Sequence, residues 1–338
     1  LRPLIEQQKL EAALEIVDQV QEKTLSTFGK SHAAYATCMA FRGKIAQRQE
    51  KYKDAVQWYL EAISLQTELY GRESPQVVIS ISTLSTIYLM MGDYVRAEPL
   101  ILETLAIREK LVGTKHPDYA RTLGTLGSLN YQKGNYFKAE LLYLEAIGIF
   151  EKTLGKKHPE YAVVLANLSS VYTETGNYAK AEPLIKEVAE IYAAAFGRQH
   201  PLYIKSLVNL SGLYTKSGNP DKSEALDLEI LALFNQDLSK ESTDYVIVLN
   251  NLGSVYLEQG EYEKAEPLFL EAEAISAKIY GRQHSSYATA LKNMGLLYSA
   301  RGDYARAESA LLEAHAINTK TLEADHPNCA HTAAALAH

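Results

Sequence analysis

The sequence has little of what a disulfide-linked, membrane-spanning or nucleic-acid-binding protein needs. Its only cysteines, Cys38 and Cys329, lie near opposite ends of 338 residues and cannot hold the fold together. We interpret both as core thiols in helices, with a reactive thiol as the alternative. No apolar run approaches the roughly 18 residues of a membrane span, and residues 1–4 do not begin a signal peptide. A net charge of −7 argues against nucleic acid. We therefore expect a cytoplasmic protein that binds neither membrane nor nucleic acid.

Motifs of catalysis and metal binding are also missing. No G-x-x-x-x-G-K-[ST], H-E-x-x-H or G-x-S-x-G pattern occurs. Six of the nine histidines recur at one phase of a repeat, which places them far apart, whereas a metal needs several ligands within a few Å. Only His326, Cys329 and His331 cluster in the sequence. We expect no enzyme activity, no cofactor and no metal. The six histidines are His32, His116, His158, His200, His284 and His326.

What the sequence does contain is a strict repeat. Six glycines, here called the anchor glycines, follow one another at intervals of 42 residues without insertion or deletion. Such regular spacing indicates one supersecondary unit stacked on copies of itself. The anchor glycines are Gly92, Gly134, Gly176, Gly218, Gly260 and Gly302.

Each unit predicts two helices. The first begins at a proline, as in His116-Pro117, where the missing N–H costs nothing, and it carries one apolar stripe. It ends at the anchor glycine, which adopts the left-handed conformation without a Cβ penalty. The second helix runs about 19 residues and has a small residue near its start that allows close approach. We expect four residues to cap second helices by accepting a backbone N–H. These are Asp93, Asn135, Asn177 and Asp303.

Some copies depart from the pattern. Glu50 takes the anchor position in the first pair. The copy from about 201 to 238 drifts, with Pro220 and Ser223 in place of the usual tyrosine and alanine, which indicates either a tolerated worn copy or a change of pitch or hinge. Prolines six residues into three second helices predict slight bends. These are Pro99, Pro183 and Pro267.

The predicted architecture is an all-α solenoid of antiparallel helix pairs, forming one domain over residues 9–338. Neither end resembles a polar capping unit and the chain does not begin with methionine, so we expect a fragment of a longer protein. The expected parts are an orphan helix at 9–28, repeats at about 33–70, 75–112, 117–154, 159–196, 201–238, 243–280 and 285–322, and a truncated helix at 327–338.

One copy carries a family signature. Its residues match the tetratricopeptide pattern in order and spacing, and the 42-residue period resembles the kinesin-light-chain type of this repeat. The near-identical copies resemble bacterial arrays of the same subtype. The resemblance implies a right-handed superhelix whose first helices line a concave groove that binds extended peptides or partner proteins. The matching residues are Leu252, Gly253, Tyr256, Gly260, Tyr262 and Ala265.

The same resemblance places groove-facing side chains 13, 10, 6 and 2 to 3 residues before each anchor position. These rows vary where the core rows repeat, so packing does not dictate them. Scattered cations there suggest an acidic peptide or a C-terminal carboxylate, with ordinary solvated charges as the alternative. The candidate groove residues are Lys44, Arg48, Arg121, Ser128, Tyr131, Ser170, Lys205, Lys216, Asn250, Ser254 and Lys292.

A ladder of asparagines recurs nine residues before the anchor glycines. Kinesin light chains carry paired asparagines here, but only Asn250-Asn251 keeps the pair. We therefore interpret the ladder as structural, bonding between helices. The carboxylate clamp of chaperone-binding members is absent, because Lys292 is followed by Leu296 instead of asparagine four residues later. The ladder consists of Asn167, Asn209, Asn251 and Asn293.

Three functions fit these observations. The first is a non-catalytic scaffold that holds an extended peptide or a partner protein in the groove. The second is the regulatory arm of a larger protein, such as a CHAT-type protease or a nucleotide-binding switch ATPase, with its enzyme domain outside this chain. The third is an array that self-associates through its open ends.

Overall fold

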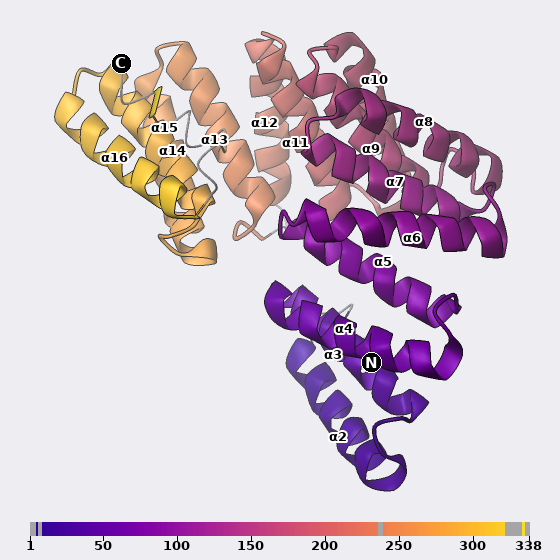
Figure 1. The fold of residues 1–338 in the computed structure, drawn as a ribbon. Helices are drawn as coiled ribbons and strands as arrows, with labels where there is room; N and C mark the ends of the chain where they lie inside the picture. Colours follow the sequence, from indigo (N-terminus) through magenta and orange to yellow (C-terminus); the bar gives the residue numbers. More distant parts are fainter. Residues whose placement is uncertain (1–4, 6–8, 236–238, 322–332, 335–338) are drawn as a thin grey trace. The chain divides into compact units, whose positions relative to one another are not determined.

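The computed structural model describes residues 5, 9–235, 239–321 and 333–334 of the chain. Within them it contains fifteen labelled helices and no strand (Figure 1), which confirms the all-α solenoid class. The helices are α2 (Leu10–Phe28), α3 (Ala33–Arg48), α4 (Tyr52–Tyr70), α5 (Pro75–Met90), α6 (Tyr94–Val112), α7 (Pro117–Gln132), α8 (Tyr136–Thr153), α9 (Pro159–Glu174), α10 (Tyr178–Phe196), α11 (Pro201–Lys216), α12 (Pro220–Phe234), α13 (Thr243–Glu258), α14 (Tyr262–Tyr280), α15 (Ser285–Ala300) and α16 (Tyr304–Thr321).

The helices form two compact units, residues 1–156 and 157–338. The first unit holds α2 and the pairs α3–α4, α5–α6 and α7–α8, and the second holds the pairs from α9–α10 to α15–α16. Within each unit consecutive helices pack side by side (Figure 1), and first helices of neighbouring pairs also touch, as α11 and α13 do. The expected orphan helix is α2, whereas the helix expected at 327–338 lies almost wholly outside the described residues. That residues 9–338 act as one domain stays a prediction.

All the first helices except α5 begin on side-chain caps that the sequence analysis missed. In five of them the Nδ1 atom of a histidine accepts the backbone N–H two residues later, at 3.1–3.2 Å. Where the histidine is missing before α13, the Ser242 hydroxyl accepts the N–H of Tyr245 instead. Helix capping therefore explains why this histidine recurs. The capping histidines are His32, His116, His158, His200 and His284.

The turn between the helices of a pair is left-handed at one residue. The anchor glycines have φ between +71° and +80°, which confirms the prediction. Glu50 occupies the same turn at φ +59° and is the one non-glycine residue with positive φ in the described ranges. A side chain in this conformation costs free energy that glycine avoids.

The predicted caps of the second helices are confirmed at two positions and wrong at two. Asp93 and Asp303 accept the N–H of the arginine three residues later, at 3.1 and 3.2 Å, and each also forms an ion pair with that arginine. Asn135 and Asn177 form no side-chain cap. A neutral amide attracts no cation, so it lacks the second contact that holds each aspartate in place.

The two helices of a pair meet at a close contact, here called the Gly–aromatic contact. A Cβ added to Gly127 on α7 would lie 2.6 Å from the ring of Tyr143 on α8, and one added to Gly253 would lie 2.5 Å from the ring of Phe269. Only a residue without a side chain fits against the ring there. Two other pairs combine a serine at the glycine position with an isoleucine at the aromatic position. They are Ser85 with Ile101 and Ser169 with Ile185.

The pair α11–α12, the drifted copy, departs from this arrangement. Asp227 stands at the aromatic position and is fully buried. The Ser223 hydroxyl lies 2.8 Å from Oγ1 of Thr215 and 3.1 Å from Oγ of Ser211, and 3.4 Å from Oδ2 of Asp227. The other carboxylate oxygen, Oδ1, is buried without a hydrogen-bond partner among the described residues. Burial raises the pKa of Asp227 to about 7.

Two further expectations concern thiols and prolines. Cys38 is buried in α3, which confirms the core-thiol interpretation, and burial raises the pKa of its thiol. Cys329 lies outside the described residues. The three prolines lie inside the continuous helices α6, α10 and α14, and the slight bends remain a prediction.

Candidate binding face

The first helices turn one row of side chains to solvent. At the position 13 residues before the anchor glycine, Ile79, Val163 and Ile247 are 62%, 47% and 38% exposed. Neighbouring residues of the stripe, such as Leu165 and Leu168, are buried. This row is one of those that the resemblance assigns to the groove, and we call the surface that carries these rows the first-helix face. Its role in binding is a proposal, taken up below.

In the first unit, three candidate residues of this face are cationic. Arg48 on α3 and Arg121 on α7 are exposed, while Lys44 on α3 is half-buried. Arg121 forms an ion pair with Asp118 one turn earlier on α7. No ion pair of Lys44 or Arg48 occurs among the residues described, so their charges are available to a partner.

Two other candidates of the first unit already have contacts within the fold. The Ser128 hydroxyl donates to a carbonyl one turn earlier, at 3.1 Å, and accepts a hydrogen bond from the Tyr143 hydroxyl at 3.1 Å. The ring of Tyr131 lies against that of Tyr136, with centroids 5.6 Å apart. Both residues are half-buried, so they shape the face more than they project from it.

In the second unit the candidate lysines differ in environment. Lys216 on α11 is exposed and forms an ion pair with Glu174 at 2.6 Å. Lys292 on α15 is half-buried, and burial lowers the pKa of its ammonium group. Lys205 on α11 is exposed and has no ion pair in the described ranges. Of the three, Lys205 is thus the cation best placed to meet an anionic partner.

One member of the asparagine ladder forms a bond between helices in the described part of the chain. Asn293 on α15 donates from Nδ2 to Oδ1 of Asn250 on α13 at 2.8 Å, which confirms bonding between helices there. The backbone carbonyl of Asn250 in turn accepts from the Ser254 hydroxyl at 2.8 Å. The same interpretation is wrong for Asn167 and Asn209, whose amides make no hydrogen bond within the described part of the chain. They line a cavity instead.

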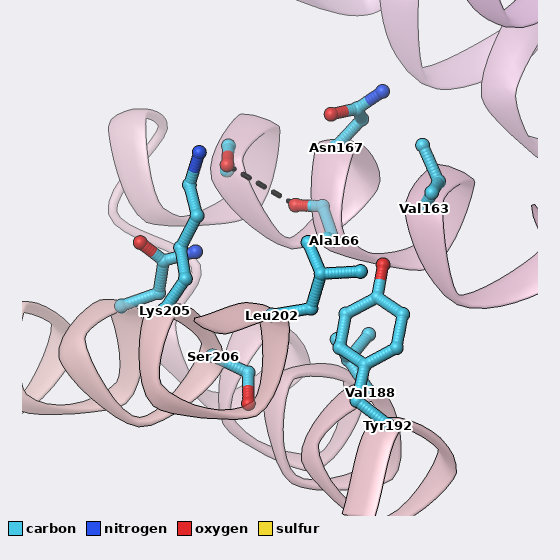
Figure 2. A pocket seen from close by; sticks show the side chains of 10 residues that line it. Val163, Ala166, Asn167, Val188, Tyr192, Leu202, Lys205 and Ser206 are labelled. Atoms are coloured by element: carbon cyan, nitrogen blue, oxygen red, sulfur yellow. Dashed lines mark hydrogen bonds between the residues drawn. The ribbon is translucent and has the colours of Figure 1, made fainter. Parts of the chain in front are cut away.

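That cavity lies in the second unit between α9, α10 and α11 and has a volume of about 360 Å³. It brings together two predicted residues, Ser170 of α9 and Lys205 of α11. Figure 2 shows Val163 and Leu202 on either side of the Tyr192 hydroxyl, with Lys205 farther along the same wall. Tyr192, from the second helix α10, was not predicted, because the resemblance assigns the groove to first helices alone.

A row of exposed leucines on the second helices was also missed. Each stands ten residues after the anchor position, and six of the seven pairs have it. About half of each side chain is exposed. The recurrence of leucine at this position of the repeat is visible in the sequence and would have revealed the row. The leucine row consists of Leu60, Leu102, Leu144, Leu228, Leu270 and Leu312.

The described residues contain neither a metal-binding cluster nor a membrane-spanning helix. Among them no group of three or more His, Cys, Asp or Glu side chains could hold a metal ion. None of the helices in the described ranges combines the length and the apolar character that a membrane span requires.

The family follows from a direct comparison. The model of the tetratricopeptide repeat family matches residues 4–68, 40–110, 76–152, 129–194, 166–236 and 244–320, which together span most of the chain. The chain therefore belongs to the tetratricopeptide repeat family, as its signature residues predicted. A search of the curated proteins finds no match.

Solved structures share the fold. A Podosopora anserina protein described as a kinesin light chain with nearly identical TPR-like repeats is 24% identical, with a TM-score of 0.53 over 62% of this chain and 99% of that one. The apo form of the quorum sensor NprR from B. thuringiensis is 15% identical, with a TM-score of 0.70 over 94% of this chain and 84% of that one. NprR in complex with its cognate peptide NprX is 16% identical, with a TM-score of 0.59 over 89% of this chain and 82% of that one. These likenesses, including one to kinesin-light-chain-type repeats, show a shared fold.

Proposed function

We propose that this chain is a non-catalytic scaffold whose first-helix face holds an extended peptide or a segment of a partner protein. The observation that carries the proposal is the contrast within each first helix. One stripe is buried and repeats, while the opposite row is exposed and varies, with apolar residues at Ile79, Val163 and Ile247. Repeat solenoids use extended surfaces of this kind for binding.

Charge favours an acidic partner. Lys44, Arg48 and Lys205 stand on or beside this face without an ion pair among the residues described. An anionic segment is attracted to such cations, and salt weakens the attraction when the charges are exposed. NprR, a distant structural relative, is a peptide-binding protein, and this agrees with a peptide as the ligand.

The proposal is tested with a displayed library of random dodecapeptides that is selected on the whole chain. We expect the selected peptides to be enriched in Asp and Glu and to bind more weakly at high salt. A photo-crosslinking residue is then placed at Ile79, Val163 or Ile247, and matched variants carry it in the leucine row at Leu102 or Leu270. Crosslinks at the first-helix positions support the proposal.

Crosslinks confined to the leucine row would instead make the second helices the binding surface and overturn the proposal. Lys44→Glu gives a second measure, because it reverses a cation of the face. Its control is Lys110→Glu, which reverses an exposed lysine of the second helix α6. A selected peptide that loses equal affinity in both variants does not lie on the first-helix face.

The regulatory-arm alternative and self-association remain predictions, as do the bacterial origin and the cytoplasmic location. No contact among the described residues favours one of them.

A further inference from the structure

The cavity between α9, α10 and α11 is lined by a hydroxyl group that makes no bond within the described part of the fold. Tyr192 is only 4% exposed, yet its hydroxyl makes no hydrogen bond with the described residues. Figure 2 shows this hydroxyl at the cavity, between Val163 and Leu202. A hydroxyl group that faces a cavity and has no partner in the fold keeps a donor that a ligand in the cavity could use.

Equivalent positions in two other pairs are satisfied internally, whereas the Ser276 hydroxyl at the same position of α14 is buried without a partner among the described residues. Sixteen residues after the anchor position, Gln66 bonds to the hydroxyl of Ser80 at 2.8 Å and Arg108 donates to that of Thr122 at 2.6 Å. In both cases the acceptor or donor lies on the next first helix. The residue at that place opposite Tyr192 is Ser206, whose hydroxyl donates to a backbone carbonyl on its own helix at 2.6 Å. Tyr192 is therefore left with an unused donor, and burial raises the pKa of Tyr192, which keeps its proton in place.

The cavity lining has one sign of charge. Lys205 is its only charged residue, and the amides of Asn167 and Asn209 add further donors. Asp244 on α13 is the acid that Lys205 influences, and it lies outside the lining. Val163, Val188 and Leu202 supply an apolar wall, with the Tyr192 ring beside them. A volume near 360 Å³ is at the lower end for small-molecule sites and suits one or two amino-acid residues.

We propose that this cavity binds a carboxylate carried on a short apolar stem, such as the C-terminal residue of a peptide or a glutamate side chain. The carboxylate lies at Lys205 and the two asparagine amides, because charge-assisted bonds are the strongest available there. The stem contacts Val163 and Leu202, and the Tyr192 hydroxyl donates to a second acceptor such as a backbone carbonyl. The inference rests on the proposed function in assigning the carboxylate to a peptide. It differs from the clamp of chaperone-binding members, since it uses another lysine position and a tyrosine of a second helix.

The test uses three small probes on the whole chain with labelled methyl groups, followed by NMR at Val163, Val188 and Leu202. N-acetyl-leucine presents a terminal carboxylate, and N-acetyl-leucinamide lacks it. The α-amide of N-acetyl-glutamic acid presents a side-chain carboxylate and no terminal one. We expect the methyl signals to shift with either carboxylate and the amide to bind about fivefold more weakly. The tighter of the two carboxylates identifies the source.

Variants locate the contacts. Lys205→Gln is expected to remove the preference for carboxylate, and Tyr192→Phe to weaken binding about threefold while retaining the ring. The matched controls are Lys222→Gln, an exposed lysine of α12 outside the lining, and Tyr203→Phe, a buried tyrosine that does not line the cavity. Both controls are expected to bind like the unmodified chain.

Equal binding of acid and amide, or equal losses in Lys205→Gln and Lys222→Gln, would overturn the inference. The scaffold proposal is judged separately by the selected peptides. A peptide that crosslinks to the first-helix face and is unaffected by Lys205→Gln leaves the scaffold standing and refutes the carboxylate site. If the probes bind at the cavity but the library yields no peptide, the carboxylate site stands and the scaffold proposal is refuted.

Discussion

Replacing Asp227 by asparagine is expected to stabilise the second unit at alkaline pH, because the change removes a buried negative charge. Asp227 is fully buried at a position where other pairs have Tyr143, Phe269 or isoleucine. Burial disfavours the ionised form of its carboxyl group, and the hydroxyl groups of Ser211 and Ser223, the latter at 3.4 Å, stabilise that form only in part. The asparagine keeps the shape and has no charge to desolvate.

The magnitude follows from the pKa of Asp227. Burial raises it from 3.8 to about 7, and each tenfold change in acidity corresponds to about 1.4 kcal/mol. Below about pH 4 the carboxyl group keeps its proton in both states. Between about pH 4 and 7 only the folded state keeps it, so stability falls as pH rises, and above about pH 7 the loss is complete at roughly 4 kcal/mol.

Hydrogen exchange measured by mass spectrometry on α11 and α12 at pH 5 and pH 8 reports the local free energy of opening. After correction for the intrinsic pH dependence of exchange, we expect the unmodified chain to lose protection between the two values. Asp227→Asn should lose much less. The comparison between variants cancels the contributions of other carboxylates.

Asp227→Ile is the companion variant, because the pair α9–α10 has isoleucine at the equivalent position. It is expected to stabilise α12 at both pH values by burying apolar surface. If Asp227→Asn were less protected than the unmodified chain at pH 8, the ionised carboxylate would have a partner and the reasoning would be refuted. An unchanged pH trend in Asp227→Asn would have the same meaning.

Three further changes test the repeat itself, each by urea denaturation followed by circular dichroism. Gly253→Ala places a Cβ 2.5 Å from the Phe269 ring and is expected to cost about 1–3 kcal/mol, whereas adding Phe269→Ile should recover part of the loss. Glu50→Gly is expected to raise the free energy of unfolding by about 1 kcal/mol, because glycine adopts the left-handed conformation without strain. Gly92→Ala, at the equivalent turn of the next pair, should lower it, and a change of the same sign in both variants would contradict backbone strain at Glu50. His158→Ala should cost about 1 kcal/mol through loss of its cap and His158→Asn much less, and a neutral alanine variant would show that the histidine cap is not stabilising.

The fold was predictable because each helix boundary has a local cause that recurs every 42 residues. Prolines at the starts and glycines at the turns act within a few residues of the backbone they control, so their positions could be read along the chain. The anchor glycines and the buried stripe of Leu165 and Leu168 illustrate this. Glu50 was assigned to the left-handed turn by phase alone.

The cavity was harder to predict because it depends on what three helices leave unfilled. Lys205 could be named from its row, but the contribution of Tyr192 arises from a second helix and from the failure of Ser206 to meet it. Asp227 was overlooked because it is a single polar residue at a repeat position that is apolar in the other pairs. The histidine caps were overlooked for a related reason, since imidazole is seldom considered among capping groups.

The Gly–aromatic contact also limits how such an array can change its length. A duplication or deletion in the gene that breaks between the two helices of a pair would join the first helix of one copy to the second helix of another. A serine such as Ser169 would then face a ring such as that of Phe269, or a glycine would face isoleucine and leave a hole. Breakpoints between pairs keep each matched couple together. Gain and loss of copies is therefore expected to proceed by whole pairs, with partners inherited jointly.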